Sequence, residues 1–273
     1  MDNSNKSPGA RTGTTRTRSA SRSPDSPSYC LTATEPIRSV IDTQQMLVSL
    51  PWLMTARRGD GHSVVVLPGL MGSDASTRLL RSYLRLLGYR VYGWTLGRNM
   101  GPTRAVMQAL PAAVERVARE SGAPVSLVGW SLGGIYARSL AQRRPWQVRQ
   151  VITLGSPYRR GGSGRVRGTS GDDSRLRATE GPVPNRRFSD SRLKMPATSI
   201  YSRWDGVVTW RRCIEPIGPM SENVAVRASH FGLGVDPLTL WTIADRLAQP
   251  ADSWQPFRAP LPLRLFFPVA DDG

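Results

Sequence analysis

Short apolar runs and longer amphipathic stretches alternate along most of the chain. Uninterrupted apolar runs are typical of strands buried on both faces, and they predict strands at Val64–Leu67, 89–94, Val125–Val128, 148–155, Ala197–Ser202 and 223–229. Between them, apolar residues recur at helical spacing, which predicts helices over 36–55, 76–88, 101–124, 133–144 and 236–250. Strand and helix in alternation predict an α/β fold, with a mostly parallel central sheet and helices on both faces.

Residues with special backbone preferences set the expected ends of these helices. Ser76 and Asp236 are placed to cap the starts of two helices, and Gly88 the end of one. Proline interrupts helical hydrogen bonding, so we expect Pro51 to break the first helix and Pro111 to kink the third.

Two stretches lack any apolar pattern. The first 34 residues are rich in Ser, Thr and Arg and predict a disordered basic tail, so the folded domain should cover 35–273. Residues 158–195 are rich in Gly, Arg and Ser and predict a flexible polar insertion before the next strand. A long loop inside a compact domain is usually functional or disordered, so this insertion is a candidate lid.

The chain is strongly basic, with a net charge of +17 and a pI of about 11.3. Residues 158–194 hold ten basic against four acidic residues, and the first 28 hold five against two. Such an excess favours contact with polyanions, and loose attraction to an anionic membrane surface fits it. No interleaved aromatic residues accompany the arginines, so we predict no specific nucleic-acid binding.

Cysteine and histidine are scarce. Cys30 and Cys213 are the two cysteines, and His62 and His230 the two histidines, so no zinc site of the usual kind is expected. We predict free thiols, no metal and no cofactor. The N-terminus has no apolar segment of the kind found in secretory signals, which favours a cytoplasmic, reducing location.

One serine stands between a predicted strand and a predicted helix. Gly129-Trp130-Ser131-Leu132-Gly133 has the form G-x-S-x-G, in which a sharp turn lifts the serine hydroxyl above the end of the strand. The two glycines keep side chains out of the crowded turn. Because the following helix begins there, developing negative charge is also favoured. These features make Ser131 a candidate nucleophile.

A serine nucleophile needs a base, and the base needs an orienting carboxylate. His62 precedes the first strand of the sheet, whereas His230 follows a strand and so lies at the same sheet edge as Ser131. We therefore expect His230 to be the base. Asp205 follows another strand end and is the predicted carboxylate. The competing acids are Asp172, Asp173 and Asp190 in the insertion and the helix-capping Asp236.

The fourth requirement is a pair of donors for the oxyanion. We expect one donor to be the backbone N–H of Leu132, directly after the serine. The second should come from the loop after the first strand, LPGLMGSD, where we choose the N–H of Leu70 over that of Met71. Leu70 and Met71 also fit an acyl pocket or the core, and we predict that Met71 and Trp130 contact substrate.

These segments resemble the α/β-hydrolase superfamily and, within it, small bacterial lipase- and esterase-like enzymes. The resemblance rests on VVVLPGLMGS, LVGWSLGGIYAR, ITLGSP, YSRWDGVV and SHFGLGVDP, between about residues 63 and 247. It implies ester hydrolysis through an acyl-enzyme by Ser131, His230 and Asp205. Pro68 stands where such lipases usually carry His, and the insertion is polar where their cap is apolar, which favours small or soluble esters.

Three functions remain open at this point. The leading hypothesis is a serine hydrolase acting on a small-molecule or lipid carboxylic ester. A thioesterase or acyltransferase would need the same residues. A binding protein that uses the fold without chemistry is the third, because fold alone does not determine function.

Overall fold

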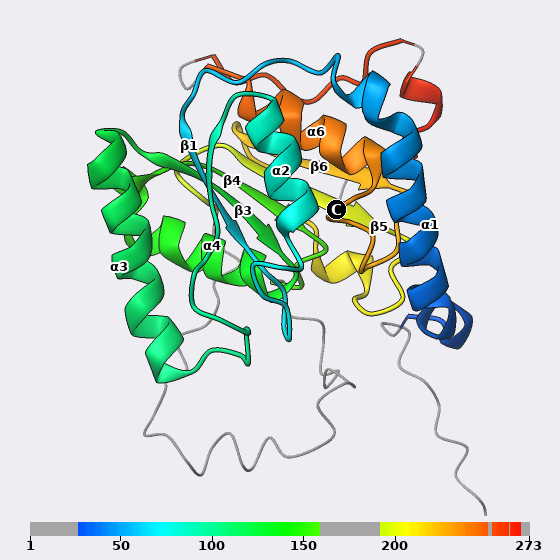
Figure 1. The fold of residues 1–273 in the computed structure, drawn as a ribbon, viewed down its shortest axis with the longest axis horizontal. Helices are drawn as coiled ribbons and strands as arrows, with labels where there is room; N and C mark the ends of the chain where they lie inside the picture. Colours follow the sequence, from blue (N-terminus) through cyan, green and yellow to red (C-terminus); the bar gives the residue numbers. More distant parts are fainter. Residues whose placement is uncertain (1–26, 159–191, 251–252, 262, 269–273) are drawn as a thin grey trace, which may run out of the picture.

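A six-stranded sheet forms the centre of the molecule (Figure 1). The computed structural model describes residues 27–158, 192–250, 253–261 and 263–268. The strands are β1 (Ser63–Leu67), β2 (Arg90–Tyr92), β3 (Val125–Trp130), β4 (Val148–Leu154), β5 (Ala197–Ser202) and β6 (Ser221–Val226). Their order is β2-β1-β3-β4-β5-β6, and each neighbouring pair is parallel. The predicted parallel α/β sheet is confirmed.

Helices cover both faces of the sheet, as Figure 1 shows. They are α1 (Tyr29–Leu53), α2 (Arg78–Leu86), α3 (Arg104–Ser121), α4 (Leu132–Arg143) and α6 (Pro237–Leu247). Val64 and Val66 of β1 join the core formed with α1, α2 and α6, whereas Val65 and Leu67 join the core formed with α3 and α4. Side chains of a strand point alternately to its two faces. The residues of β1 are apolar without interruption because each face of the strand packs into one of these two cores.

The order of the strands places a ligand site. The chain passes from β1 outward to β2 and then returns to place β3 on the other side of β1. In open parallel sheets, ligands bind beyond the carboxyl ends of the strands at such a reversal. The loop after β1 contains Leu70, and the turn after β3 contains Ser131, so both meet at this reversal.

Helix α1 corrects two predictions. It begins at Tyr29, so residues 29–34 belong to a helix and not to a disordered tail, and it continues through Pro36 and Pro51 without ending. Tertiary packing holds the segment beyond Pro51, because the Trp52 ring stacks on Trp241 with centroids 4.6 Å apart and the Leu53 carbonyl accepts a bond from Tyr83. Residues 1–26 lie outside the described part of the chain.

Other boundaries differ by a few residues. Helix α2 has Thr77, not Ser76, at its N-cap, and the Ser76 hydroxyl bonds instead within the preceding turn, to the Ser73 carbonyl. Pro111 lies inside the continuous helix α3. Most of the predicted insertion at 158–195 falls outside the described residues.

The C-terminal segment lies on the surface, as the proline-rich sequence beyond Pro250 predicts. Its described residues, 253–261 and 263–268, are exposed or half-buried and form no α-helix or strand. The segment is nevertheless attached, because the Phe257 N–H donates to Glu222 and the rings of Phe257 and Phe267 pack together with centroids 5.2 Å apart. Both cysteines are free, as predicted. Among the described residues, no helix has the length and apolar character needed to cross a membrane.

Asp236 caps helix α6 as predicted, and its environment is unusual. Its carboxylate accepts bonds from the N–H and hydroxyl of Thr239, at 2.8 and 2.9 Å. Burial nevertheless raises its pKa to about 6, opposed by the Thr239 bonds and assisted by the nearby charge of Asp42. The folded protein therefore holds this proton more tightly than the unfolded chain does.

This raised pKa predicts a pH-dependent stability. The contribution of Asp236 is fully present below the unfolded pKa near 4 and is lost as the pH rises through about 6, a change of about 3 kcal/mol. Asp236→Asn keeps a capping oxygen but does not titrate. The free energy of unfolding of the variant, minus that of wild type, is therefore expected to rise by about 3 kcal/mol between pH 4 and pH 7. Urea unfolding across this range measures it, and a constant difference would contradict the assignment.

Candidate active site

Ser131, His230 and Asp205 form one hydrogen-bonded chain. The Ser131 Oγ lies 3.1 Å from His230 Nε2, and His230 Nδ1 lies 2.6 Å from Asp205 Oδ2. The second carboxylate oxygen of Asp205 accepts bonds from the N–H groups of Val207 and Val208, which fix its orientation. Asp205 and His230 are both buried. The structure thus brings the three predicted residues together, although 99 positions separate Ser131 from His230.

The turn at Ser131 has the backbone shape that the glycine pattern predicts. Ser131 has φ 53° and ψ −118°, a strained conformation for a residue with a side chain. A Cβ on Gly129 would lie 2.4 Å from the Cα of Gly134, and one on Gly133 would lie 2.2 Å from the carbonyl oxygen of Leu67. The glycines therefore allow β1, β3 and α4 to meet at the serine.

Gly133 offers a direct test of this packing. We expect Gly133→Ala to lower the free energy of unfolding by about 2 kcal/mol or more, because the added methyl group meets backbone on β1 that cannot rotate away. Ser139→Ala on the same helix should change it by less than about 0.5 kcal/mol. Chemical denaturation of both variants gives the comparison. Equal stability of Gly133→Ala and wild type would show that the turn is looser than described.

The loop after β1 approaches the serine closely. A Cβ on Gly69 would lie 3.1 Å from the Cβ of Ser131, so the backbone beside Gly69 reaches the serine itself. The Met71 N–H is already used, because it donates to the Asn99 carbonyl at 2.7 Å. Within the described part of the chain, the Leu70 N–H has no such partner. Leu70 therefore remains the better donor of the two for an oxyanion.

Leu132 supplies the other expected donor. It is the first residue of α4, and the N–H groups of a first helical turn have no partner within the helix. The positive end of the helix dipole also lies there. A negatively charged oxygen beside Ser131 would thus meet two N–H groups, from Leu70 and Leu132.

Asn99 holds the loop after β1 in place, a role that no pattern in the sequence predicted. Its side-chain amide donates to the Pro68 carbonyl at 2.9 Å, and its backbone N–H donates to the Gly72 carbonyl at 2.8 Å. With the bond from Met71, three contacts tie the loop to one fully buried residue. The shape of the expected oxyanion site therefore does not depend on a histidine at position 68.

The two predicted substrate contacts differ in their surroundings. Met71 has a positive φ of 62° and is 53% exposed, so it is free to contact a substrate. Trp130 is partly buried, and its indole N–H donates to the His230 carbonyl at 3.0 Å while its ring packs against Gly234. Trp130 therefore helps to position the loop that carries His230, and its contact with a substrate stays a prediction.

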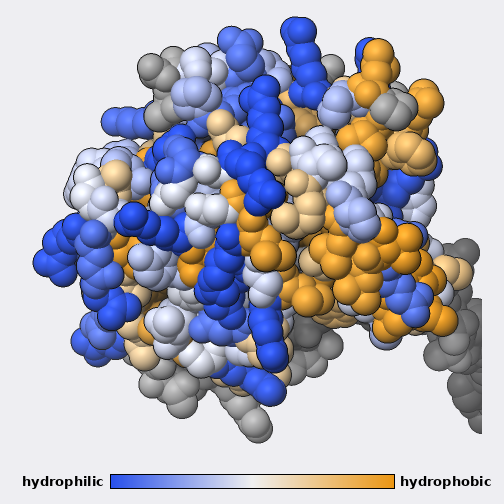
Figure 2. Space-filling model, turned by 45° about the horizontal axis from the view of Figure 1, so that its top comes forward, coloured by the Kyte–Doolittle hydropathy of each residue, from blue (hydrophilic) through white to orange (hydrophobic). Residues whose placement is uncertain are grey.

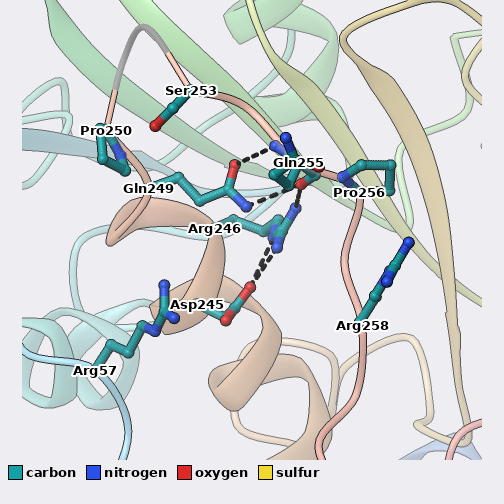
Figure 3. Close-up of a pocket in the computed structure, with 9 residues that line it drawn as sticks. All are labelled: Arg57, Asp245, Arg246, Gln249, Pro250, Ser253, Gln255, Pro256 and Arg258. Carbon is teal, nitrogen blue, oxygen red and sulfur yellow. Dashed lines mark hydrogen bonds and ion pairs between the residues drawn. The ribbon is translucent and has the colours of Figure 1, made fainter.

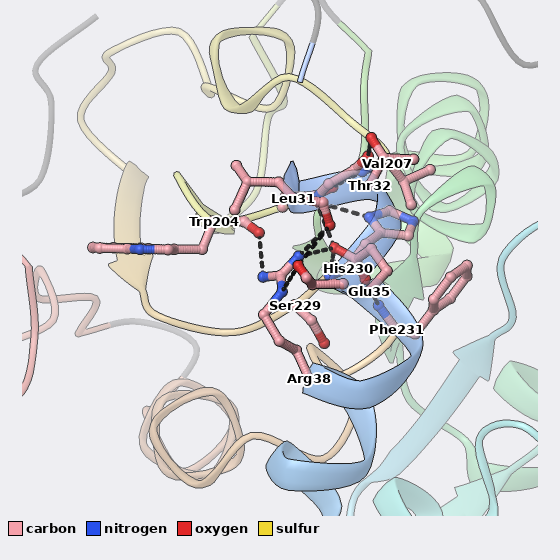
Figure 4. A network of polar contacts seen from close by, with 12 residues as sticks. Leu31, Thr32, Glu35, Arg38, Trp204, Val207, Ser229, His230 and Phe231 are labelled. Atoms are coloured by element: carbon pink, nitrogen blue, oxygen red, sulfur yellow. Dashed lines mark hydrogen bonds and ion pairs between the residues drawn. The ribbon is translucent and has the colours of Figure 1, made fainter. Parts of the chain in front are cut away.

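A buried carboxylate from α1 joins the two loops that carry Asp205 and His230 (Figure 4). Glu35 is 1% exposed, and its oxygens accept bonds from the backbone N–H groups of Gly206, His230 and Phe231, at 2.6, 3.0 and 3.2 Å. Arg38 pairs with the same carboxylate at 3.0 Å and donates to the Trp204 carbonyl. The histidine loop and the acid loop are thus held to one side chain.

A second acid of α1 holds the histidine loop from the other side. Asp42 accepts bonds from the N–H and hydroxyl of Ser229, at 3.1 and 2.5 Å. A Cβ on Gly232 would lie 1.7 Å from this carboxylate, so the glycine leaves room for it. Burial raises the pKa of Asp42, opposed by its bonds to Ser229.

Solved structures resemble this fold at low sequence identity. No protein-family model matches the chain, and no curated protein matches it. Aspergillus fumigatus lipase B matches with a TM-score of 0.53 and 16% identity, over 70% of this chain and 54% of that one. The pyrethroid hydrolase PytH matches with a TM-score of 0.50 and 21% identity, over 70% of this chain and 99% of that one. The chain has the α/β-hydrolase fold. The match spans about half the length of the fungal lipase.

His62 lies at the other end of this hydrolase fold, as predicted. It directly precedes β1, and its Nε2 lies 2.8 Å from the Ser126 Oγ, while Nδ1 pairs with Asp60. Burial lowers its pKa, opposed by the bond to Asp60. His62 is therefore a partnered structural residue, far along the sheet from Ser131.

A pocket at the end of α6 is not part of this site (Figure 3). It has a volume of about 420 Å³, and the residues that line it are Arg57, Asp245, Arg246, Gln249, Pro250, Ser253, Gln255, Pro256 and Arg258. Its central cation, Arg246, is already paired with Asp245, Glu222 and the Gln255 carbonyl. The pocket adjoins the C-terminal end of α6, whereas the histidine loop precedes the N-terminal end of that helix.

Among the residues that the structure describes, no three His, Cys, Asp or Glu side chains gather as a metal site would need. The thiol of Cys213 is fully buried, and burial raises its pKa well above the ordinary value. It is therefore a packed core residue.

Proposed function

We propose that this protein is a serine hydrolase that cleaves carboxylic esters through an acyl-enzyme. The observation that carries the proposal is the chain of contacts from Ser131 Oγ through His230 to Asp205, at 3.1 and 2.6 Å. Such a chain activates a serine for attack and otherwise has no evident structural purpose. The two N–H groups beside the serine, from Leu70 and Leu132, complete the set.

In the first half of the reaction, His230 Nε2 takes the proton of Ser131 while Oγ attacks the ester carbonyl carbon. The carbonyl oxygen becomes negative and accepts bonds from the N–H groups of Leu70 and Leu132. Asp205 stabilises the charged imidazole and keeps its Nδ1 protonated. When the tetrahedral intermediate collapses, His230 gives its proton to the departing alcohol and Ser131 stays acylated.

In the second half, a water molecule takes the place of the alcohol. His230 removes its proton, the water oxygen attacks the acyl carbon, and the intermediate collapses with the proton returning to Ser131 Oγ. The acid is released and the enzyme is restored. Each proton thus moves through His230 Nε2.

Exposed apolar side chains that adjoin site residues in the sequence favour an apolar acyl group. Leu70 and Met71 follow Gly69, which approaches Ser131, and Phe231 follows His230. Their exposed fractions are 50%, 53% and 53%. The ring of Phe231 contacts the edge of His230, with centroids 5.7 Å apart. The similar structures are described as a lipase and a pyrethroid hydrolase, and this supports ester chemistry.

A series of p-nitrophenyl esters from acetate to laurate tests this proposal. We expect hydrolysis by wild type, with a maximum in kcat/KM at one chain length, and loss of at least 10³-fold in Ser131→Ala with an unchanged melting temperature. Equal hydrolysis by wild type and Ser131→Ala would contradict the proposal. Turnover confined to thioesters would assign the same residues to a thioesterase.

A further inference from the structure

The outer face of α1 is apolar and uncovered. We define it by Ile37, Val40, Ile41, Leu47 and Val48, whose side chains are 65%, 56%, 45%, 55% and 82% exposed. Their spacing of three, four and seven residues puts them on one side of the helix. Figure 2 shows apolar side chains gathered on the right of the molecule, the side along which α1 runs in Figure 1.

The charged residues of α1 lie on the opposite side. The helix has only Glu35, Arg38 and Asp42, and all three are committed to the loops that carry Asp205 and His230. The outer face therefore has no charged side chain of its own. Contiguous apolar surface of this kind marks an interaction site, because its exposure to water is unfavourable in free energy.

The two longest segments outside the described residues, 1–26 and 159–191, are poorly suited in composition to cover this face. Residues 1–26 contain only Met1, Ala10 and Ala20 as hydrophobic residues, and 159–191 contain five scattered among arginines, serines and glycines. Neither segment has an apolar run that could pack along a helix. We therefore look for a partner other than these two segments.

The net charge of the chain favours an anionic lipid surface over a second copy of the chain as the partner of this face. A second copy would bring its own net charge of +17 to the interface, and this repulsion opposes pairing. A surface of anionic lipid is attracted by the same charge. Five basic against two acidic residues lie in the 28 positions that precede α1 in the sequence. An apolar helix face on a strongly basic chain is the combination that binds at an anionic bilayer surface.

We propose that the outer face of α1 docks the protein on the surface of an anionic bilayer. Helix α1 would lie along the lipid headgroups, with Ile37 and Val48 inserted among them. The inner side of the same helix holds the loops of Asp205 and His230, so docking would bring the site close to the lipid. The inference does not depend on the proposed esterase activity.

Sedimentation with vesicles tests the proposal on the full chain. We expect wild type to sediment with vesicles of phosphatidylglycerol and phosphatidylcholine (1:1), much less with phosphatidylcholine alone, and less in 0.5 M NaCl. Ile37→Glu/Val48→Glu should lower the partition coefficient by about tenfold or more, since each change removes apolar contact and adds repulsion. Leu86→Glu/Trp146→Glu, at exposed apolar positions elsewhere, should stay within about twofold of wild type.

Labelling by a fluorophosphonate probe separates docking from catalysis, because Ile37 and Val48 lie outside the reacting groups and both double variants should label like wild type. Ile37→Ser/Val48→Ser replaces the Glu variant if that does not fold. Unchanged vesicle binding in the α1 variant would overturn the proposal. A second result would also overturn it: wild type does not bind vesicles and is a dimer by light scattering, while the α1 variant is a monomer. The apolar face would then be the contact with a second copy of the chain.

Discussion

Replacing His230 with alanine is expected to lower kcat for p-nitrophenyl ester hydrolysis by a factor on the order of 10⁴ to 10⁶. Without the imidazole, the proton of Ser131 has no acceptor at 3.1 Å, and the departing alcohol has no donor. The fold should tolerate the change, because the contacts of the histidine loop use the backbone of His230, whose N–H meets Glu35 and whose carbonyl meets Trp130. KM should change little by comparison.

His62→Ala is the matched control. The chain has two histidines, and both are hydrogen-bonded, so a non-specific effect of losing an imidazole would appear in both variants. His62 lies at the amino ends of the strands, so we expect its variant to keep kcat within about threefold and to lose some stability. An active His230→Ala, or a His62→Ala variant that is folded and inactive, would contradict the assignment of the base.

Glu35→Leu is expected to lower the free energy of unfolding by about 3 to 5 kcal/mol. The substitution leaves the N–H groups of Gly206, His230 and Phe231 without an acceptor and leaves the cation of Arg38 without its acid. Buried donors that lose their partner incur their full desolvation penalty. At a temperature where the variant is folded, kcat should also fall, because the acid loop and the histidine loop lose their common anchor.

Glu35→Gln separates these effects. The amide oxygen of glutamine can accept some of the bonds, but its NH₂ group would face backbone N–H groups and cannot accept from them. We therefore expect an intermediate loss of stability and a partial recovery of kcat. Guanidinium unfolding and ester kinetics on the same preparations provide both readouts. If Glu35→Leu were as stable as wild type, the carboxylate would not hold the two loops.

The strands and the reacting residues could be predicted from the sequence for identifiable physical reasons. A strand buried on both faces needs an unbroken apolar run, and Val64–Leu67 is such a run, buried throughout. Ser131 stood out because a strand, a turn with two glycines and a helix surround it. His230 followed from scarcity, since the other histidine precedes its strand, and Asp205 followed from its place after β5.

The supports of the site could not be predicted in the same way. Glu35 meets His230 across 195 positions, and Asp42 meets Ser229 across 187, so no local pattern connects them. Only the position of α1 against the loops shows why a helix with an apolar outer face has two buried acids. Asn99 and Trp130 likewise act through contacts with distant backbone, at Pro68 and His230. Pro51 was read from propensity alone, and packing around Trp52 overrides it.

Labelling with a fluorophosphonate probe tests the central claim most directly. The probe reacts with a serine only when a base activates it and donors hold the phosphoryl oxygen, and mass spectrometry locates the adduct. We predict one adduct on the peptide that contains Ser131, absent from Ser131→Ala and His230→Ala and present in His62→Ala. A folded wild type that takes up no probe, or takes it up at another residue, would contradict the account of Ser131 as the nucleophile.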